Sequence, residues 1–332
     1  MTGKKVMTVL GPVPPEALGV VDAHSHLYIA PVPGGAADAP VLVDADGVGR
    51  ELASFRAAGG GAIVDCQPGG CGRDGRVLRR LSELSGVHVI AATGFHRRIY
   101  YPPDTPLFAL SAGAAADLFR GEIFEGLVET RTEGEPQTTD DGPQTTVAGG
   151  LSSVVHPGVI KIAAEASFAA SPRALFEAAA AVANETGYAI EMHTERGAAV
   201  EDFLAFFVAQ GVSPRRLVFC HVDKRPDFGL HAELARAGVM LEYDTFFRPK
   251  YEPERNVWPL IGRMVAAGLT GQVALATDMA DPGLWAELGG APGLQGIFSI
   301  IKAGLTGLDL PPSSIDGLMG GNIGGRLAIE KN

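Results

Sequence analysis

The 332-residue sequence predicts an α/β fold of the (β/α)8 (TIM) barrel type, forming a single domain over residues 1–332. Short apolar runs alternate with segments of helical periodicity, which is the pattern of parallel strands that are buried on both faces and joined by helices. Eight such runs occur, and eight β/α units in a chain of this length favour a closed barrel over an open doubly wound sheet. No glycine-rich phosphate loop follows the first run, which disfavours a dinucleotide-binding fold.

The first expected strand is VVDAHSHLYI, residues 20–29, whose apolar β-branched start leads into His24-Ser25-His26. The later apolar runs predict strands over 60–70, 87–96, 158–165, 188–195, 216–223, 239–247 and 272–280. Helical spacing, often ended by glycine, predicts helices over 51–60, 75–86, 111–127, 172–187, 198–211, 228–238 and 255–269, with a helical region running on to residue 328.

Residues 130–156 interrupt this alternation. They are rich in Thr, Gly and Asp and show little periodicity, so we expect an irregular surface insertion. His156, at its end, is interpreted as a loop histidine rather than a ligand. His88, between two valines of an expected strand, and His231, on an expected helix, are interpreted as structural.

Composition limits the classes of partner. The formal net charge of −11 argues against a nucleic-acid or anionic-membrane partner, although a local basic pocket could still hold an anionic small molecule. No apolar stretch approaches the length of a membrane span, and the N-terminal apolar run is too short for a signal peptide. The three cysteines, Cys66, Cys71 and Cys220, are too few for a disulfide framework and favour a reducing compartment. We therefore expect a cytoplasmic protein; a metal clip at Cys66-x4-Cys71 is the less favoured interpretation of that pair.

Chemically active side chains occur where the expected strands end. Side chains alternate faces along a strand, so His24 and His26 point the same way and can grip one metal ion. Asp22, just upstream, could orient one of these ligands. Later strand ends add Lys161, His193, His221 and Asp278. In a barrel of this type, functional residues gather at the carboxyl ends of the strands.

Taken singly, His193 or His221 could be a satisfied polar group near the core, and Asp278 could cap a helix. Lys161 lies between two isoleucines, where an unpaired ammonium would be costly to bury. The coincidence of all these residues at successive strand ends therefore indicates a metal site.

With these residues in view, the stretches DAHSH, ATGFH, GVIKIA, EMHTE, FCHVD, EYDTF and ATDM resemble the amidohydrolase superfamily, and more narrowly the phosphotriesterase family with its lactonase members. The resemblance spans residues 20–328, apart from 130–156. It implies a site for two divalent ions, with zinc the best match and manganese, cobalt or iron open. It also suggests a homodimer.

Position by position, the resemblance implies that His24, His26 and Asp278 hold the more buried ion and that His193 and His221 hold the more exposed one. Lys161, carboxylated by CO2, would bridge both ions together with a hydroxide. Asp278 would accept the proton of the attacking hydroxide and pass it to the leaving group.

The substrate is harder to infer. His96 stands in TGFH where many family members carry tyrosine, and the pattern looks closer to members that act on sugar lactones, some of them phosphorylated. We expect His96 to contact the substrate and take part in catalysis. Basic residues that could hold a carboxylate or phosphate follow several strand ends: Arg97, Arg98, Lys224, Arg225, Arg248 and Lys250. Among these, Arg248 and Lys250, near Tyr251, are the expected substrate contacts.

Three functions remain open at this point. The first is a metal-dependent lactonase that opens an ester ring. The second is a phosphotriesterase or other carboxylic ester hydrolase that uses the same centre. The third is a barrel that binds a small molecule without turning it over. Deaminase or amidase chemistry on the same scaffold is a further option.

Overall fold

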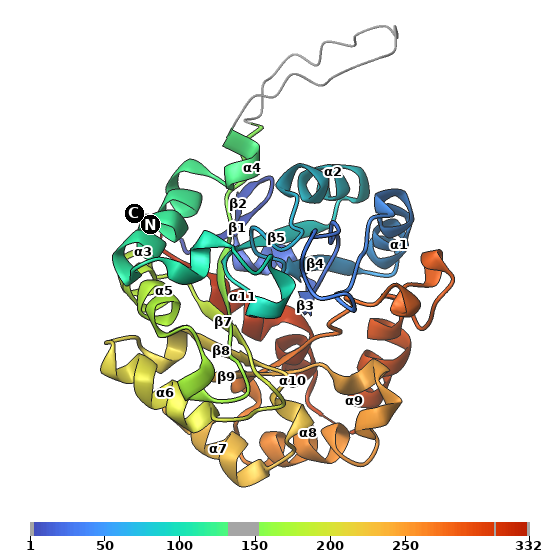
Figure 1. The fold of residues 1–332 in the computed structure, drawn as a ribbon. Coiled ribbons are helices and arrows are strands. Elements are labelled where there is room, and N and C mark those ends of the chain that lie inside the picture. The colour runs from blue at the N-terminus through green and yellow to red at the C-terminus, as the bar shows by residue number, and fades with distance from the viewer. Residues whose placement is uncertain (1–2, 132–152, 309, 331–332) are drawn as a thin grey trace, which may run out of the picture.

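The computed structural model describes residues 3–131, 153–308 and 310–330. Among these residues, eight parallel strands form a nearly closed barrel with helices around it (Figure 1). The strands are β3 (Val20–Ser25), β4 (Gly60–Asp65), β5 (His88–Gly94), β6 (Val159–Ala163), β7 (Ile190–His193), β8 (Leu217–Cys220), β9 (Met240–Tyr243) and β10 (Val273–Leu275). Each strand pairs with its neighbour in the sequence, in the order β3 to β10, which confirms the predicted (β/α)8 barrel.

The barrel closes where the end of β10 meets β3. The backbone N–H of Asp278 donates to the carbonyl of His24 at 2.8 Å. The carboxylate of Asp22 accepts from the backbone N–H of Thr277 at 2.9 Å and from the Thr277 hydroxyl at 2.5 Å. Asp22 was expected to orient a ligand; its contacts hold the backbone beside Asp278 in place, and its link to His24 is a long one to the backbone N–H, at 3.4 Å.

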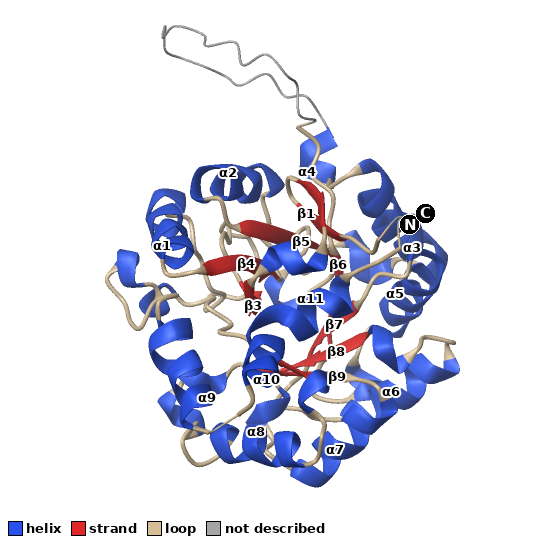
Figure 2. Cartoon of the chain, turned by 180° about the vertical axis from the view of Figure 1, so that it is seen from behind, coloured by secondary structure: helices blue, strands red, loops and turns tan. Residues whose placement is uncertain are grey.

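Helices cover the outside of the barrel, as Figure 2 shows in blue around the red strands. They are α1 (Ala45–Ala57), α2 (Gly75–Ser85), α3 (Ala112–Glu125), α4 (Val128–Arg131), α5 (Arg173–Thr186), α6 (Val200–Ala209), α7 (Phe228–Ala237), α8 (Val257–Ala266), α9 (Ala303–Gly307), α10 (Pro312–Asp316) and α11 (Asn322–Leu327). Their apolar faces pack on the barrel wall through large buried side chains such as Phe55, Phe119, Phe176 and Phe203. None of the described helices is long and apolar enough to cross a membrane.

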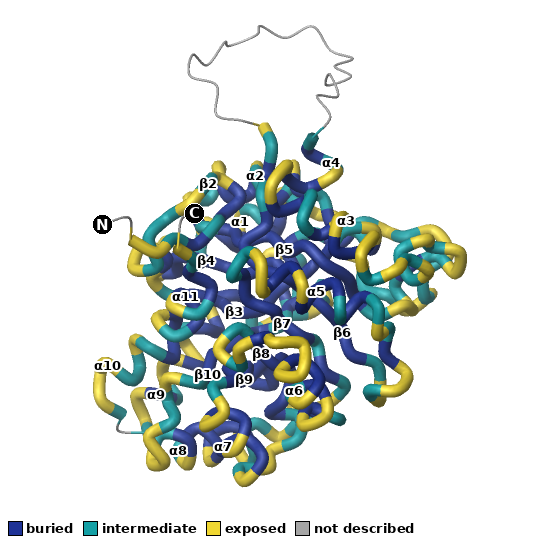
Figure 3. The backbone as a smooth tube through the Cα atoms, turned by 90° about the vertical axis from the view of Figure 1, so that its left-hand side faces the viewer, coloured by how far each residue is buried: buried dark blue, intermediate teal, exposed yellow. Residues whose placement is uncertain are grey.

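The inside of the barrel has two levels. Small and medium apolar side chains fill the lower level, among them Ala62, Ala92, Val159, Val218 and Ala274. The next inward positions towards the carboxyl ends of the strands are fully buried and carry charged side chains or thiols. Figure 3 shows the barrel strands as buried segments of the backbone. These upper positions hold Lys161, Cys66, Glu191, Cys220 and Glu242. Fully buried charged and polar groups need hydrogen-bond or charge partners, so we expect the side chains at this level to contact one another.

The structure differs from the predicted element bounds in several places. The first helix, predicted over 51–60, begins six residues earlier, as α1 over Ala45–Ala57. A short antiparallel hairpin, β1 (Val6–Thr8) and β2 (Gly11–Val13), was not predicted, because its glycine and proline content hides a strand pattern. The prediction of irregular chain from residue 130 is wrong for 130–131, which lie in α4; residues 132–152 lie outside the described part of the chain. The barrel strands are shorter than the predicted runs because polar residues at their ends lie in the connecting loops.

Candidate metal centre

The predicted ligands meet at the carboxyl end of the barrel. The Nε2 atoms of His24 and His26 lie 3.9 and 3.8 Å from Oδ1 of Asp278. The rings of His193 and His221 have centroids 4.7 Å apart, and the rings of His24 and His221 are 4.9 Å apart. Strands that are distant in sequence therefore bring these imidazoles and this carboxylate to one place.

These separations fit a shared ion better than hydrogen bonds among the side chains. Contacts of 3.8–3.9 Å between ring nitrogens and Asp278 exceed hydrogen-bond length. Two donors about 2.0–2.2 Å from one ion lie roughly 3.3–3.8 Å apart, and imidazole with carboxylate is a donor set that zinc takes. The residues His24, His26 and Asp278 therefore fit a divalent metal.

Two of the predicted ligands adopt an unusual backbone conformation. His221 directly follows β8 with φ +65°, and Asp278 follows β10 with φ +50°. A non-glycine residue in the left-handed region costs about 1–3 kcal/mol, and such residues cluster at functional sites. The backbone bonds around Thr277 and Asp278 hold the strained turn in place.

Burial sets the charge state of the site. It lowers the pKa of His26 to about 4 and lowers the pKa of His24, His193 and His221 below the ordinary value. These imidazoles are therefore neutral at pH 7, the form that binds metals. For Asp278, burial alone would raise the pKa, but the charged groups of Arg248 and Lys224 lower it, so the carboxylate is ionised.

Lys161 has no exposed surface and lies within this cluster. Its Nζ is 3.3 Å from Nε2 of His24 and 3.7 Å from Oε1 of Glu191. Burial alone would lower the pKa of this amine, but neighbouring Cys220, Cys66 and Glu191 raise it above its ordinary value. The unmodified side chain is thus an ammonium paired with Glu191, which answers the burial cost noted from the sequence. Carboxylation stays a prediction.

Sequence reasoning missed the carboxylates that hold the histidine rings. Oε1 of Glu242 lies 2.8 Å from Nδ1 of His24, and Oδ2 of Asp244 lies 2.5 Å from Nδ1 of His221. The more exposed His193 has Nε2 2.9 Å from Oε1 of Glu195. The available signal was the alternation of acidic residues in EYD and EMHTE, which puts them on the inner face of their strands.

A pocket of about 380 Å³ opens above the cluster. His96 lines it as expected, with its ring centroid 5.3 Å from that of His193. The backbone N–H of Arg97 donates to Nδ1 of His96 at 2.7 Å, so Nε2 carries the proton of the neutral ring. Tyr100, which was not predicted, packs edge-on against His96 with centroids 4.7 Å apart.

The residues that were expected to bind an anion differ in whether they reach the pocket. Arg248 donates to Oδ2 of Asp278 at 3.0 Å, and Lys250 lies 5.2 Å from the ring centroid of Tyr251. None of Arg248, Lys250 and Tyr251 lines the pocket, whereas Lys224 does and lies 5.5 Å from the same ring centroid. These side chains therefore form a basic cluster at the edge of the pocket beside Asp278.

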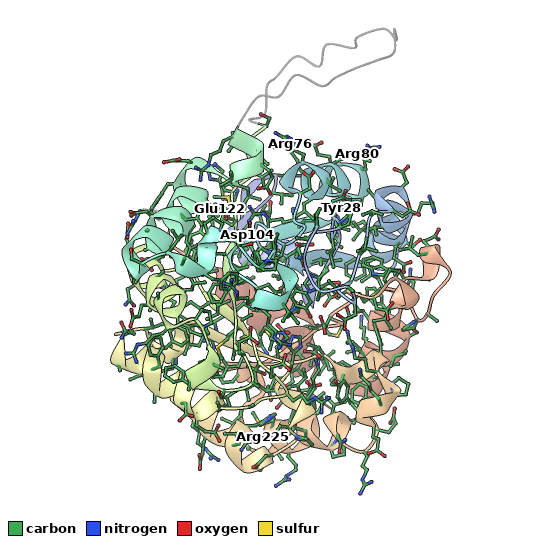
Figure 4. All side chains as sticks on the ribbon, viewed as in Figure 1. Tyr28, Arg76, Arg80, Asp104, Glu122 and Arg225 are labelled. Atoms are coloured by element: carbon green, nitrogen blue, oxygen red, sulfur yellow. The ribbon has the colours of Figure 1, made fainter. Side chains whose placement is uncertain are left out.

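The remaining basic candidates have their own partners. Arg97 pairs with Glu195 at 2.7 Å and with Glu165 at 3.0 Å. Arg225 pairs with Glu201 at 3.2 Å near the rim of the barrel, where Figure 4 labels it. The guanidinium of Arg98 lies over the ring of Phe108, 4.8 Å from its centroid.

The histidines and cysteines outside the cluster are accounted for by local contacts. His231, a buried residue of α7, lies 2.8 Å from the hydroxyl of Tyr243, and His156 lies 3.0 Å from the carbonyl of Ile123. His88 begins β5 and is partly buried. The thiols of Cys66 and Cys71 have different neighbours, Glu191 and Pro68. The Cys66-x4-Cys71 clip is therefore not formed.

An eight-stranded barrel with imidazoles, a carboxylate and a buried lysine at the strand ends defines the class of barrel hydrolases built on a metal centre. The sequence matches the phosphotriesterase family over residues 4–135 and 144–291, and the chain belongs to this family of hydrolases. The break between these matches lies within the predicted insertion.

Individual relatives agree with this assignment. A phospho-furanose lactonase of Mycoplasmopsis synoviae (strain 53) is 27% identical over 292 residues, covering 84% of this chain and 77% of that protein. An N-acetyltaurine hydrolase of Tetraodon nigroviridis is 29% identical over 275 residues, covering 73% and 72%. The crystal structure of an amidohydrolase from Mycoplasma synoviae superposes with a TM-score of 0.85 at 24% identity, covering 100% and 94%.

Proposed function

We propose that this chain is a binuclear-metal lactonase that opens the ring of a phosphorylated sugar lactone. The observation that carries the proposal is the convergence of four histidines and Asp278 at the floor of a 380 Å³ pocket. His24, His26 and Asp278 would hold one ion, and His193 and His221 the second, with carboxylated Lys161 between them. Zinc suits this donor set, and manganese, cobalt or iron would also fit it.

When bound, the two ions would lower the pKa of a shared water and polarise the lactone carbonyl. The ionised carboxylate of Asp278 accepts the proton of the attacking water and delivers it to the ring oxygen as the ester C–O bond breaks. The product is the open hydroxy acid. His96, whose Nε2–H faces no described acceptor, donates a hydrogen bond to the substrate from the pocket wall.

The basic cluster at the pocket edge supports an anionic substrate. The names of the two relatives describe substrates with a phosphate or a sulfonate beside the acyl group. Lys224 lines the pocket, and Arg248 adjoins it through Asp278; Lys250 and Tyr251 complete the cluster. We propose that Lys224, which lines the pocket, binds the phosphate of the lactone.

Hydrolysis of an amide with an anionic tail is the second candidate, and the 29% identity to the N-acetyltaurine hydrolase favours it over phosphotriester hydrolysis. The same attack on a carbonyl would then expel an amine instead of an alkoxide. Phosphotriester hydrolysis and ligand binding without turnover remain as outcomes of the test.

The test is a substrate panel on protein reconstituted with zinc or manganese and bicarbonate. It compares a phosphorylated pentonolactone, the neutral lactone, N-acetyltaurine and a phosphotriester. We expect the phosphorylated lactone to give the highest kcat/KM. Tight binding without turnover at full metal occupancy, or a preference for N-acetyltaurine or the phosphotriester, would contradict the proposal.

The proposed contact between Lys224 and the phosphate is tested by substituting this lysine. Lys224→Gln should raise KM for the phosphorylated lactone about 10- to 100-fold, because a charged hydrogen bond contributes about 1.5–3 kcal/mol. It should leave the neutral lactone nearly unchanged. Lys302→Gln, an exposed lysine on the outer surface, is the matched control. Equal losses on both lactones would remove the anion contact from the proposal.

A further inference from the structure

We infer that Glu242 is a positioning residue that fixes the ring of His24 for metal binding, and that Asp244 does the same for His221. The inference rests on the metal centre of the proposed function. It assigns both orienting carboxylates to β9 and the residue that directly follows it, a stretch that contributes nothing to the expected ligand set.

The geometry around His24 sets its tautomer. Glu242 has no exposed surface, and its Oε1 lies 2.8 Å from Nδ1 of His24. Burial raises the pKa of Glu242 well above its ordinary value. In its ionised form the carboxylate can only accept, so this bond then places the ring proton on Nδ1. The lone pair is left on Nε2, the nitrogen that lies 3.9 Å from Oδ1 of Asp278. Glu242 therefore aims the correct nitrogen at the expected ion.

The same stretch serves the second histidine. Glu242 and Asp244 are two residues apart, so both side chains point into the barrel. Oδ2 of Asp244 lies 2.5 Å from Nδ1 of His221, which leaves Nε2 of that ring for an ion. This one stretch thus supports a ligand of each expected ion, His24 on β3 and His221 directly after β8.

Glu191 is a competing partner for His24, since its Oε1 lies 3.3 Å from the same Nδ1. That oxygen also receives the thiol of Cys66 at 2.5 Å and faces Nζ of Lys161 at 3.7 Å. Glu242 Oε1 is closer to the ring and has His24 as its described hydrogen-bond partner. We therefore assign the orienting contact to Glu242 and the lysine contact to Glu191.

The alternative interpretation of the side chains around Glu242 is a third metal ion, bound deeper in the barrel than the two expected ions. Ligand atoms of His24, Glu191, Cys220 and Glu242 all lie within 4.8 Å of one another, and Oε2 of both glutamates is buried without a hydrogen-bond partner. Two features argue against it. The 2.8 Å contact between His24 and Glu242 is a hydrogen-bond distance, shorter than the roughly 3.3 Å between two donors on one ion. Nζ of Lys161 also lies 3.7–3.8 Å from Glu191 and Cys220, so the lysine side chain already occupies the space beside these two residues.

The experiment measures metal affinity rather than activity. Zinc or cobalt is titrated into metal-free full-length protein in competition with a chromophoric chelator, and the two binding steps are fitted separately. Glu242→Gln should weaken the tighter step about 10-fold and Glu242→Ala up to about 100-fold. Asp244→Asn should weaken mainly the second step. Glu51→Gln is the matched control, because that buried carboxylate binds the backbone N–H groups of Glu287 and Leu294 away from the site.

A second readout covers the case of poor folding. In 15N-labelled wild-type protein the Nδ1–H of His24 should give a slowly exchanging imidazole signal, which Glu242→Gln shifts or removes. Wild-type affinity for both ions in the Glu242 variants would overturn the inference. So would a third cobalt ion with a thiolate charge-transfer band that Cys220→Ser abolishes. A wild-type protein that binds no divalent ion would instead defeat the proposed function itself.

Discussion

The two halves of the candidate centre differ in how they are shielded from water. On the β3–β10 side, His24 and His26 have side chains only 1% and 5% exposed, and the supporting Glu242 is fully buried. On the β7 side, the His193 side chain is 16% exposed and its partner Glu195 is 30% exposed. The other ligands do not follow this division, since Asp278 is 17% exposed and His221 is 2% exposed. The contrast therefore lies between the two supporting pairs, His24 with Glu242 and His193 with Glu195. A hydrogen bond to a charged group is stronger at low dielectric. The buried half should therefore hold its ion more tightly and exchange it more slowly.

The largest expected effect comes from breaking the buried half at its carboxylate. Asp278→Asn removes both a proposed ligand and the proposed proton acceptor, so kcat should fall by about 10²–10⁴-fold. Bound metal should also fall, as elemental analysis would show. Arg263→Gln, on the outer face of α8, is a suitable surface control. Turnover within a few-fold of wild type would contradict the assignment of Asp278.

Acid should destabilise the metal-free protein through its buried histidines, of which His26 is one. Burial holds the pKa of His26 at about 4 in the folded protein, against about 6.5 in the unfolded chain. Between these values the unfolded chain binds a proton that the folded chain does not. The free energy of unfolding of the metal-free protein should therefore fall as pH drops from 6.5 to 4, by about 3 kcal/mol for this residue.

Urea unfolding at several pH values measures this slope, which is the change in the free energy of unfolding with pH. His26→Asn should flatten it, because the variant has no imidazole to protonate at that position. His88→Gln, at a partly exposed position, should change it less. An identical slope in wild type and His26→Asn would exclude His26 as the source.

The smallest effect is expected on the exposed half. Glu195→Gln weakens the contact to His193, but the pair is partly solvated and Glu195 is shared with Arg97. Affinity for the weaker-bound ion should fall only a few-fold, and less at high salt because exposed charges are screened. The same chelator competition reports it. A loss larger than that of Glu242→Gln would reverse the proposed order of the two halves.

The candidate metal ligands at the strand ends could be predicted because each stands out within a short stretch of sequence. The HxH pair follows from alternation along one strand, and Lys161 was conspicuous because it interrupts an apolar run. The eight-fold β/α rhythm then placed His193, His221 and Asp278 at one end of a barrel. The carboxylates that orient the histidine rings were not predicted, because Glu242 and its partner His24 are 218 residues apart in the sequence. Acidic residues in a strand do not reveal which ring they face.

The barrel, the family and the candidate metal ligands could all be predicted from the amino-acid sequence, because hydrophobic periodicity and strand-end chemistry are encoded within short segments. The three-dimensional structure was needed to see which ring nitrogens of His24 and His221 face a carboxylate, which carboxylate holds each ring, and which basic side chains reach the pocket. Those properties depend on distances between strands that only closure of the barrel brings within hydrogen-bond range.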